Sequence, residues 1–211
     1  MRPIKFGPFA PVTALTTALN AQGFNSTGAA VAPTTTSTSD GLAHQVTLTA
    51  PVQSTLAGVT FTIIGTDADN NAQTETGLTG PASGATVTST KYYKTVATLM
   101  PSATMGALTV AVGIAAPSLS SSLVLSENLV AAANLTITVT GTVNITVNDT
   151  IGNVWDIAPS TLPWSAISAL TSKTATTDGA ARAAATAVQI LTNSVTNGAT
   201  YTLWVGQLTR I

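Results

Sequence analysis

The chain has 211 residues, of which 45% are hydrophobic and only 7% are charged. This length suffices for one large domain or two small ones with real cores. A typical soluble domain has about 25% charged residues, so most of the surface here must consist of Thr, Ser, Ala and Gly. With a formal net charge of -1, contact with other subunits is the economical explanation of such a surface. The composition predicts an oligomer or a lattice component.

Composition also argues against several other classes of protein. The seven Lys and Arg residues are scattered along the chain, whereas nucleic-acid binding requires clustered basic residues. The absence of cysteine excludes disulfides and thiolate metal sites. We find neither a secretory signal nor an apolar segment long enough to span a membrane as a helix. Nucleic acid and membrane are therefore not expected as partners.

The first part of the sequence has little hydrophobic periodicity. Residues 1–24 contain Pro3, Pro8 and Pro11, which predicts an extended arm with at most one short helical turn. The next stretch, NSTGAAVAPTTTSTSD, has the composition of a linker. We therefore expect an extended N-terminal arm and linker over residues 1–39, and such arms often lie across neighbouring subunits.

From residue 40 onward the sequence shows the period-two alternation of half-buried strands. In the first stretch, His44, Val46 and Leu48 alternate with polar residues. Turn-forming clusters at 67–71 and 79–84 mark the ends of hairpins. Strands are expected over residues 44–49, 59–63, 91–99 and 106–114. Together they predict a β-sandwich domain over residues 40–116.

A second block of alternation predicts a further domain. Strands are expected over residues 135–139 and 143–147, from residue 186, and over 200–205. A bend at 140–142 would fold the first pair on itself, and the turn at 196–199 is typical of a closing hairpin. Between them lies a loop in which Trp155 and Trp164 are expected to anchor the chain to the sheet. The fold class is therefore all-β, with two antiparallel β-sandwich domains, the second over residues 117–211.

The stretch 178–191 is locally ambiguous. Its alanines favour a helix, whereas Val188 and Ile190 with their flanking threonines favour a strand. We favour a strand from Thr186.

Candidate catalytic or metal-binding residues are few. His44 is the only histidine, and apart from Asp40 the sequence suggests no partners for a metal cluster or a nucleophilic triad. A strand histidine with a satisfied hydrogen bond explains it better. We predict no catalytic, cofactor-binding or metal-binding residues, and hence no enzyme and no cofactor.

An acidic cluster superficially resembles a calcium loop. It consists of Asp67, Asp69, Asn71 and Glu75. An EF-hand loop requires Gly at its sixth position and Glu at its twelfth, where this chain has Ala72 and Leu78. A hairpin turn is the better interpretation.

Two groups of aromatic residues offer alternative binding sites. Tyr92 and Tyr93 lie between Lys91 and Lys94, which would suit a carbohydrate or an anionic partner, although strand alternation with one Tyr inward explains the pattern more simply. The loop that contains Trp155 and Trp164 is a second candidate for a glycan or receptor. A binding module therefore stays open as an alternative.

Several segments look similar to those of one family of structural proteins. They are DGLAHQVTLT at 40–49, GVTFT at 58–62, GTDADNNA at 65–72, YYKTV at 92–96 and, more loosely, ATAVQIL at 185–191. These segments resemble small β-rich accessory head or neck proteins of tailed bacteriophage virions. The resemblance covers residues 40–100 best and leaves the N-terminal residues and the Trp-containing middle unmatched.

The resemblance implies a virion structural protein that is assembled in the host bacterial cytoplasm. A capsid decoration (cement) subunit or a head-to-tail connector component of the neck is the expected role. The expected partners are further copies of the chain and other virion proteins such as major capsid or neck proteins. A tail or fibre subunit, or a carbohydrate- or receptor-binding β module, remains the alternative.

Overall fold

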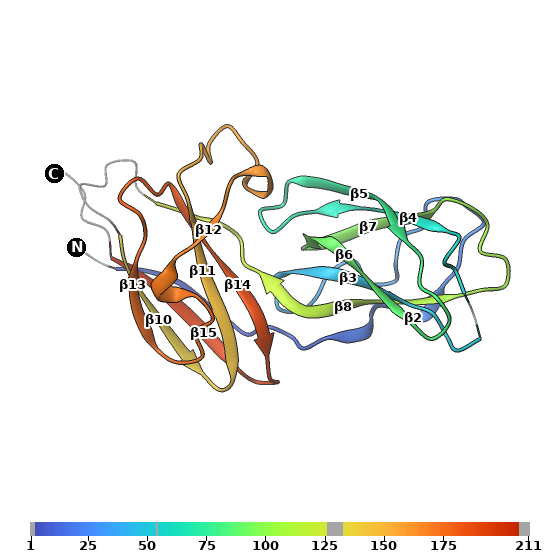
Figure 1. Ribbon diagram of the computed structural model, residues 1–211, viewed down its shortest axis with the longest axis horizontal. Helices are drawn as coiled ribbons and strands as arrows, with labels where there is room; N and C mark the ends of the chain where they lie inside the picture. Colours follow the sequence, from blue (N-terminus) through green and yellow to red (C-terminus); the bar gives the residue numbers. More distant parts are fainter. Residues whose placement is uncertain (1–2, 54, 126–132, 207–211) are drawn as a thin grey trace. The chain divides into compact units, whose positions relative to one another are not determined.

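A computed structural model describes residues 3–53, 55–125 and 133–206 of the chain (Figure 1). Within these ranges the chain forms β-strands and two short 3-10 turns, with no α-helix, which confirms the predicted all-β class. Its contacts divide the chain into two compact units. Unit 1 comprises residues 1–13 and 119–211, and unit 2 comprises residues 14–118.

Unit 2 is built from antiparallel strands in two sheets. One sheet contains, in order, β2 (Leu15–Phe24), β8 (Val110–Leu119), β3 (Ala43–Thr49) and β6 (Thr86–Tyr93). The other contains β5 (Ala72–Thr79), β4 (Thr60–Thr66) and β7 (Thr95–Pro101). Alternate residues such as Val46 on β3 and Ile63 on β4 are fully buried. The expected alternation therefore places one apolar face of each sheet in the core.

Unit 1 also has two antiparallel sheets. One contains, in order, β1 (Ile4–Phe9), β15 (Thr200–Gly206), β10 (Asn134–Thr140) and β13 (Thr177–Ala180). The other contains β12 (Ser165–Ala166), β11 (Val143–Thr150) and β14 (Ala187–Val195), and the short β9 (Leu123–Val124) also pairs with β14. The two 3-10 turns are η1 (Pro159–Thr161) and η2 (Ser168–Leu170).

A single hydrophobic core lies between the two sheets of unit 1. Ile137 on β10, Ile145 on β11 and Ile190 on β14 are completely buried in it. The Tyr201 hydroxyl lies 2.9 Å from Thr192 Oγ1, so a polar contact joins β15 of one sheet to β14 of the other. Burial of both inner faces makes the unit sandwich-like.

The N-terminal residues differ from the expected arm. β1 pairs with β15, and β2 pairs with β8, so both strands of residues 1–24 belong to sheets. Further along, Val31 bridges to Leu99 and Ser37 bridges to Thr95, along β7. Prolines misled the sequence interpretation here, because an edge strand tolerates a proline that a central strand would not. The boundaries of the units accordingly differ from the expected boundaries at residues 39 and 116.

The strand expected over residues 91–99 is two strands. β6 ends at Tyr93 and β7 begins at Thr95, and the two belong to different sheets. β5, with the sequence AQTETGLT, was not expected at all, because most of its residues are polar and only Glu75 is buried. Alternation shows that a segment is extended, but it does not show where the chain crosses from one sheet to the other.

The two hairpins expected in unit 1 are also corrected. β10 and β11 lie in different sheets, and so do β14 and β15. The tight turn at 196–199 is present, with Ala199 N donating to Thr196 O, but it connects the two layers. Each strand turns its apolar side toward the same core, which a connection between layers allows as well as a hairpin does.

In unit 2, side chains of β5 and β6 form hydrogen bonds with backbone groups at each other's strand edges. The Glu75 carboxylate accepts hydrogen bonds from the backbone N–H groups of Thr90 and Lys91, at 2.9 and 3.1 Å. In return, Lys91 Nζ donates to the Thr74 carbonyl at 2.7 Å. An open strand edge invites pairing with another chain. These contacts satisfy edge groups and leave this side of unit 2 unsuited to strand addition.

Tyr93 makes the stability of unit 2 sensitive to alkaline pH. Burial, with a smaller effect from the Glu75 charge, raises the pKa of Tyr93 well above its ordinary value of 10.0. Because the folded state favours the neutral phenol, this contribution to stability is full below about pH 10 and is lost as pH rises beyond it. Urea unfolding followed by circular dichroism should show this alkaline loss, and Tyr93→Phe should reduce it. An equal alkaline loss in Tyr93→Phe would contradict the assignment.

Candidate docking loop

The loop between β11 and β12 carries an unusual group of exposed apolar side chains. Ile151 is 54% exposed, Trp155 is 50% exposed and Ile157 is 46% exposed. Single exposed apolar residues are normal, but several large ones in one short loop make it a candidate interaction site. We refer to residues 151–164 as the docking loop.

Asn153 holds the tip of the docking loop in a defined conformation. Its side-chain oxygen accepts hydrogen bonds from the backbone N–H groups of Trp155 and Asp156, at 3.1 and 3.3 Å. Its side-chain nitrogen donates to Asp156 Oδ2 at 2.6 Å, and Ile157 N donates to the Asn153 carbonyl. Asn is well suited to this role, because its short amide can bond to the backbone two and three residues further on. The tip is therefore ordered without burying Trp155.

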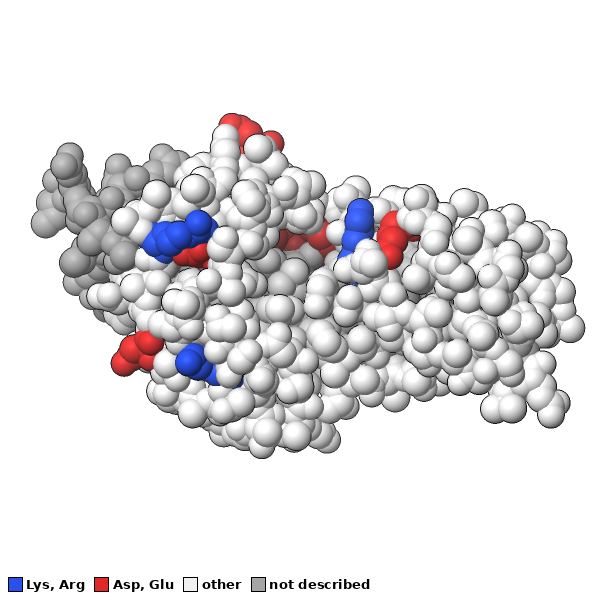
Figure 2. Space-filling view, viewed as in Figure 1, with Lys and Arg blue, Asp and Glu red and all other residues white. Residues whose placement is uncertain are grey.

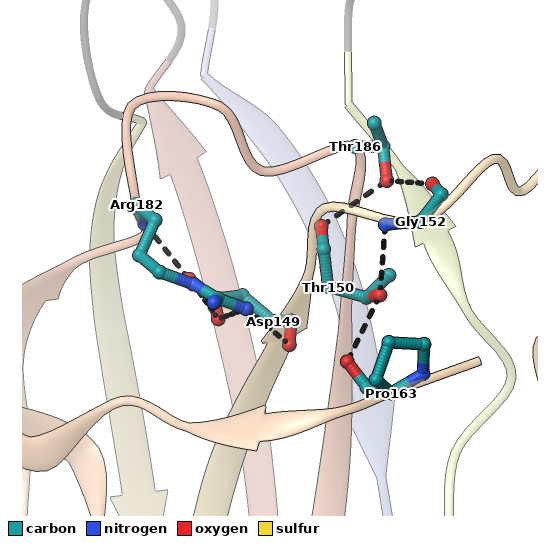
Figure 3. A network of polar contacts seen from close by, with 6 residues as sticks. All are labelled: Asp149, Thr150, Gly152, Pro163, Arg182 and Thr186. Carbon is teal, nitrogen blue, oxygen red and sulfur yellow. Dashed lines mark hydrogen bonds and ion pairs between the residues drawn. The ribbon is translucent and has the colours of Figure 1, made fainter.

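Hydrogen bonds of two threonine hydroxyls hold the two ends of the docking loop, which we call its base, in place (Figure 3). Thr150 Oγ1 donates to the Pro163 carbonyl at 3.2 Å and accepts from Gly152 N at 3.1 Å. Thr186 Oγ1 lies 2.6 Å from the Gly152 carbonyl and 3.1 Å from the Thr150 carbonyl, between the two. The beginning and end of the loop are thus tied to each other and to the segment before β14.

Packing secures the second half of the docking loop. Leu162 is buried and its side chain lies against Gly152, so that a Cβ atom added at Gly152 would be 2.6 Å from Leu162 Cδ2 and would displace that side chain. Trp164 Nε1 donates to the Pro159 carbonyl at 2.7 Å. Trp164 therefore bonds within the loop, a contact that differs from the expected anchoring of both tryptophans to the sheet, and Trp155 is 50% exposed.

An ion pair lies next to the base of the docking loop (Figure 3). Arg182 Nε donates to Asp149 Oδ1 at 2.8 Å, and Arg182 N donates to Asp149 Oδ2 at 2.8 Å. The Asp149 side chain is 2% exposed, and that of Arg182 is 45% exposed. The pair borders a cavity of about 240 Å³. Its lining residues are Asp149, Ser165, Ala166, Ile167, Ser168, Ala180 and Arg182. The acid and the base are bonded to each other, so we assign the pair a structural role.

The charged residues of the surface are sparse. On the face shown in Figure 2, most of the area belongs to uncharged residues. Such a surface lacks the like-charge repulsion that keeps subunits apart. Around an ordered apolar loop, it permits close contact with another protein.

His44 and Asp40 lie together in unit 2, where both side chains are 1% exposed. His44 Nε2 lies 2.9 Å from Asp40 Oδ2, and His44 Nδ1 lies 3.1 Å from the Ala115 carbonyl. His44 is therefore a strand histidine with both ring nitrogens in hydrogen bonds, as the sequence interpretation had it.

The acidic cluster forms a β-hairpin. Asp67 Oδ1 accepts hydrogen bonds from the backbone N–H groups of Asp69 and Asn71, each at 2.9 Å, in the turn between β4 and β5. Glu75 instead bonds to β6, and Tyr93 is buried while Tyr92 is partly exposed. In the described ranges no three His, Cys, Asp or Glu residues are placed to share a metal ion.

Sequence reasoning missed two parts of the site. It singled out Trp155 but not Ile151 and Ile157, although the segment IGNVWDIAP combines large apolar residues with turn-forming ones. It also missed the contact between Asp149 and Arg182, which are distant in sequence. No local sequence pattern indicates that two residues so far apart form an ion pair.

Comparison with protein-family models, with curated proteins and with solved structures gave no match. Among the described residues, no helix is both long and apolar enough to cross a membrane.

Proposed function

We propose that this chain is a structural protein that acts by assembling with other protein subunits, as an accessory head protein of a tailed-bacteriophage virion. A capsid decoration (cement) subunit and a head-to-tail neck component are the two roles that suit it. The observation that supports assembly is the ordered docking loop with its exposed Ile151, Trp155 and Ile157. The segments that resemble phage accessory proteins supply the virion context.

The energetics of the docking loop favour association. Burying a large apolar side chain contributes about 1.5–3 kcal/mol, and Trp is enriched among the residues that dominate interfaces. Because Asn153 and the two threonine hydroxyls already order the loop, binding loses little conformational entropy there. Three such side chains on an ordered loop suit an apolar surface of a neighbouring subunit.

The proposed partners are further copies of the chain and other virion proteins, such as major capsid or neck proteins. Assembly would take place in the bacterial cytoplasm, and the finished protein would reside in the virion. A tail or fibre subunit would use the same surface. The number of copies in each particle would separate these roles.

Light scattering coupled to size-exclusion chromatography over a wide concentration range tests the self-assembly part of this proposal. Discrete oligomers would support it, and a monomer at every concentration would contradict it. A combined variant with Ile151→Ser, Trp155→Ser and Ile157→Ser should shift the equilibrium toward smaller species, because the interface loses its apolar area. Thermal stability should change little, since the three side chains are exposed.

Val52→Ser is the matched control for this variant. Val52 is 80% exposed and lies outside the docking loop, so its replacement should leave the oligomer distribution unchanged. Equal shifts in both variants would mean that general surface hydrophobicity, and not the docking loop, drives association.

The exposed Trp155 also favours a second candidate function, because an aromatic ring can stack on a sugar. A glycan-array screen addresses this alternative. Specific binding that is lost in Trp155→Ala, while the fold is retained, would establish a carbohydrate-binding module instead.

A further inference from the structure

The strand β1 is separated in the sequence from the rest of the unit to which it belongs. β1 covers Ile4–Phe9 and lies in unit 1, but the chain then forms the whole of unit 2 before it returns to unit 1 at residue 119. Within the described chain, β1 is thus connected to its pairing partner β15 only through unit 2.

β1 occupies a well-defined site at the edge of β15. Lys5 pairs with Trp204 and Phe6 pairs with Leu203, in antiparallel register. Phe6 and Phe9 pack against the hydrophobic core of unit 1, and the ring centroids of Phe9 and Tyr201 lie 5.3 Å apart. The side chains and the backbone of β1 therefore both contribute to recognition of this edge.

The segment that follows β1 has the character of a hinge. Residues 10–14 form neither a strand nor a helix. Pro11 fixes its own backbone angle and biases the preceding residue toward an extended conformation. An extended hinge suits a strand that reaches away from unit 2 to a neighbouring molecule.

We propose that β1 is exchanged between copies of this chain, so that β1 of one subunit pairs with β15 of the next. This inference rests on the proposed function, because it requires self-assembly. Exchange keeps every contact of β1, whereas the conformation and contacts of residues 10–14, where Pro11 is buried, and the entropy of association differ. The low charge of the chain, 7%, leaves little repulsion between copies. Strand exchange would link each subunit to the next by paired strands, in addition to weaker surface contacts such as those of the docking loop.

Disulfide trapping tests this exchange directly, because the chain contains no cysteine of its own. Lys5 and Trp204 are paired residues on β1 and β15. The variants Lys5→Cys and Trp204→Cys are produced in the same cells, with a size tag on one of them, and the purified mixture is oxidised. Exchange predicts that the covalent heterodimer becomes the main cross-linked species.

Thr140→Cys and Thr200→Cys form the matched control. These residues are paired on β10 and β15, which both belong to the contiguous part of unit 1. Without exchange of β10, mixing these two variants should give no heterodimer above the random level. The double variants Lys5→Cys/Trp204→Cys and Thr140→Cys/Thr200→Cys show whether each pair can form a disulfide at all.

The possible outcomes separate this inference from the proposed function. Oligomers in light scattering together with a Lys5→Cys and Trp204→Cys heterodimer support both. Oligomers with only intrachain disulfides in the double variant overturn strand exchange and leave assembly intact. A monomer at every concentration without heterodimer overturns both. Equal heterodimer yields in the test and control pairs would also overturn exchange, since they would indicate random collisions.

Discussion

Replacing Asp40 by alanine should lower the free energy of unfolding by about 3 kcal/mol, because it leaves buried donors without their acceptor. Asp40 accepts hydrogen bonds from Thr38 Oγ1 at 2.7 Å and from Leu42 N at 3.1 Å, besides its contact with His44. Both His44 and Asp40 have side chains that are 1% exposed, so water cannot replace the lost partner. Urea unfolding measures this change.

The contact of His44 Nδ1 with the Ala115 carbonyl, at 3.1 Å, does not involve Asp40, so the change reports on the Asp40 contacts. Thr38→Val is the control, because it removes one neutral donor and should cost only about 1 kcal/mol. Similar losses in Asp40→Ala and Thr38→Val would show that the buried pair adds nothing beyond one hydrogen bond.

The second large effect is expected for Arg182→Met, which should cost about 3 kcal/mol because it leaves a buried carboxylate without its cation. Asp149 is 2% exposed, and Arg182 Nε and Nη2 both lie 2.8 Å from its Oδ1. Only the backbone N–H of residue 182 would still donate to this side chain among its present partners. Thermal and urea unfolding of the full chain measure the loss.

The double variant Asp149→Leu/Arg182→Met separates the ion pair from general packing. Replacing both charges by apolar groups removes the uncompensated carboxylate, so the double variant should be more stable than Arg182→Met alone. A double variant that is as unstable as the sum of its two single variants would contradict the coupling. In either case the docking loop should keep its conformation, because the hydroxyl contacts of Thr150 and Thr186 do not involve Arg182.

The sequence predicted individual strands better than their partners. The strands expected at residues 44–49, 135–139 and 200–205 correspond to β3, β10 and β15. In each of them alternate residues are apolar and their neighbours are mostly Thr, which is a local signal that needs no knowledge of the fold. β5 was missed because its polar residues bond to a neighbouring edge, through Glu75, instead of filling the core.

The candidate site was only partly predictable. The loop followed from the composition of residues 148–164, but the contact of Trp164 with Pro159 inside the loop did not. The exposure of Ile151 and Ile157 did not follow from the sequence, because their hydrophobicity taken alone predicts burial. What leaves them outside is the ordering of the backbone by Asn153, Thr150 and Thr186, and Thr186 is far from the loop in the sequence.

By itself, the sequence determined the all-β class, the inward face of several strands such as β3, β10 and β15, and the positions of several turns, because alternation and turn propensity act over a few neighbouring residues. Only the tertiary structure decided that β6 and β7, β10 and β11, and β14 and β15 belong to different sheets. It also placed β1 beside β15, although residues 1–24 had been expected to form an arm. The physical reason is that an alternating strand satisfies its backbone equally well with any suitable edge, and long-range packing selects which edge it joins.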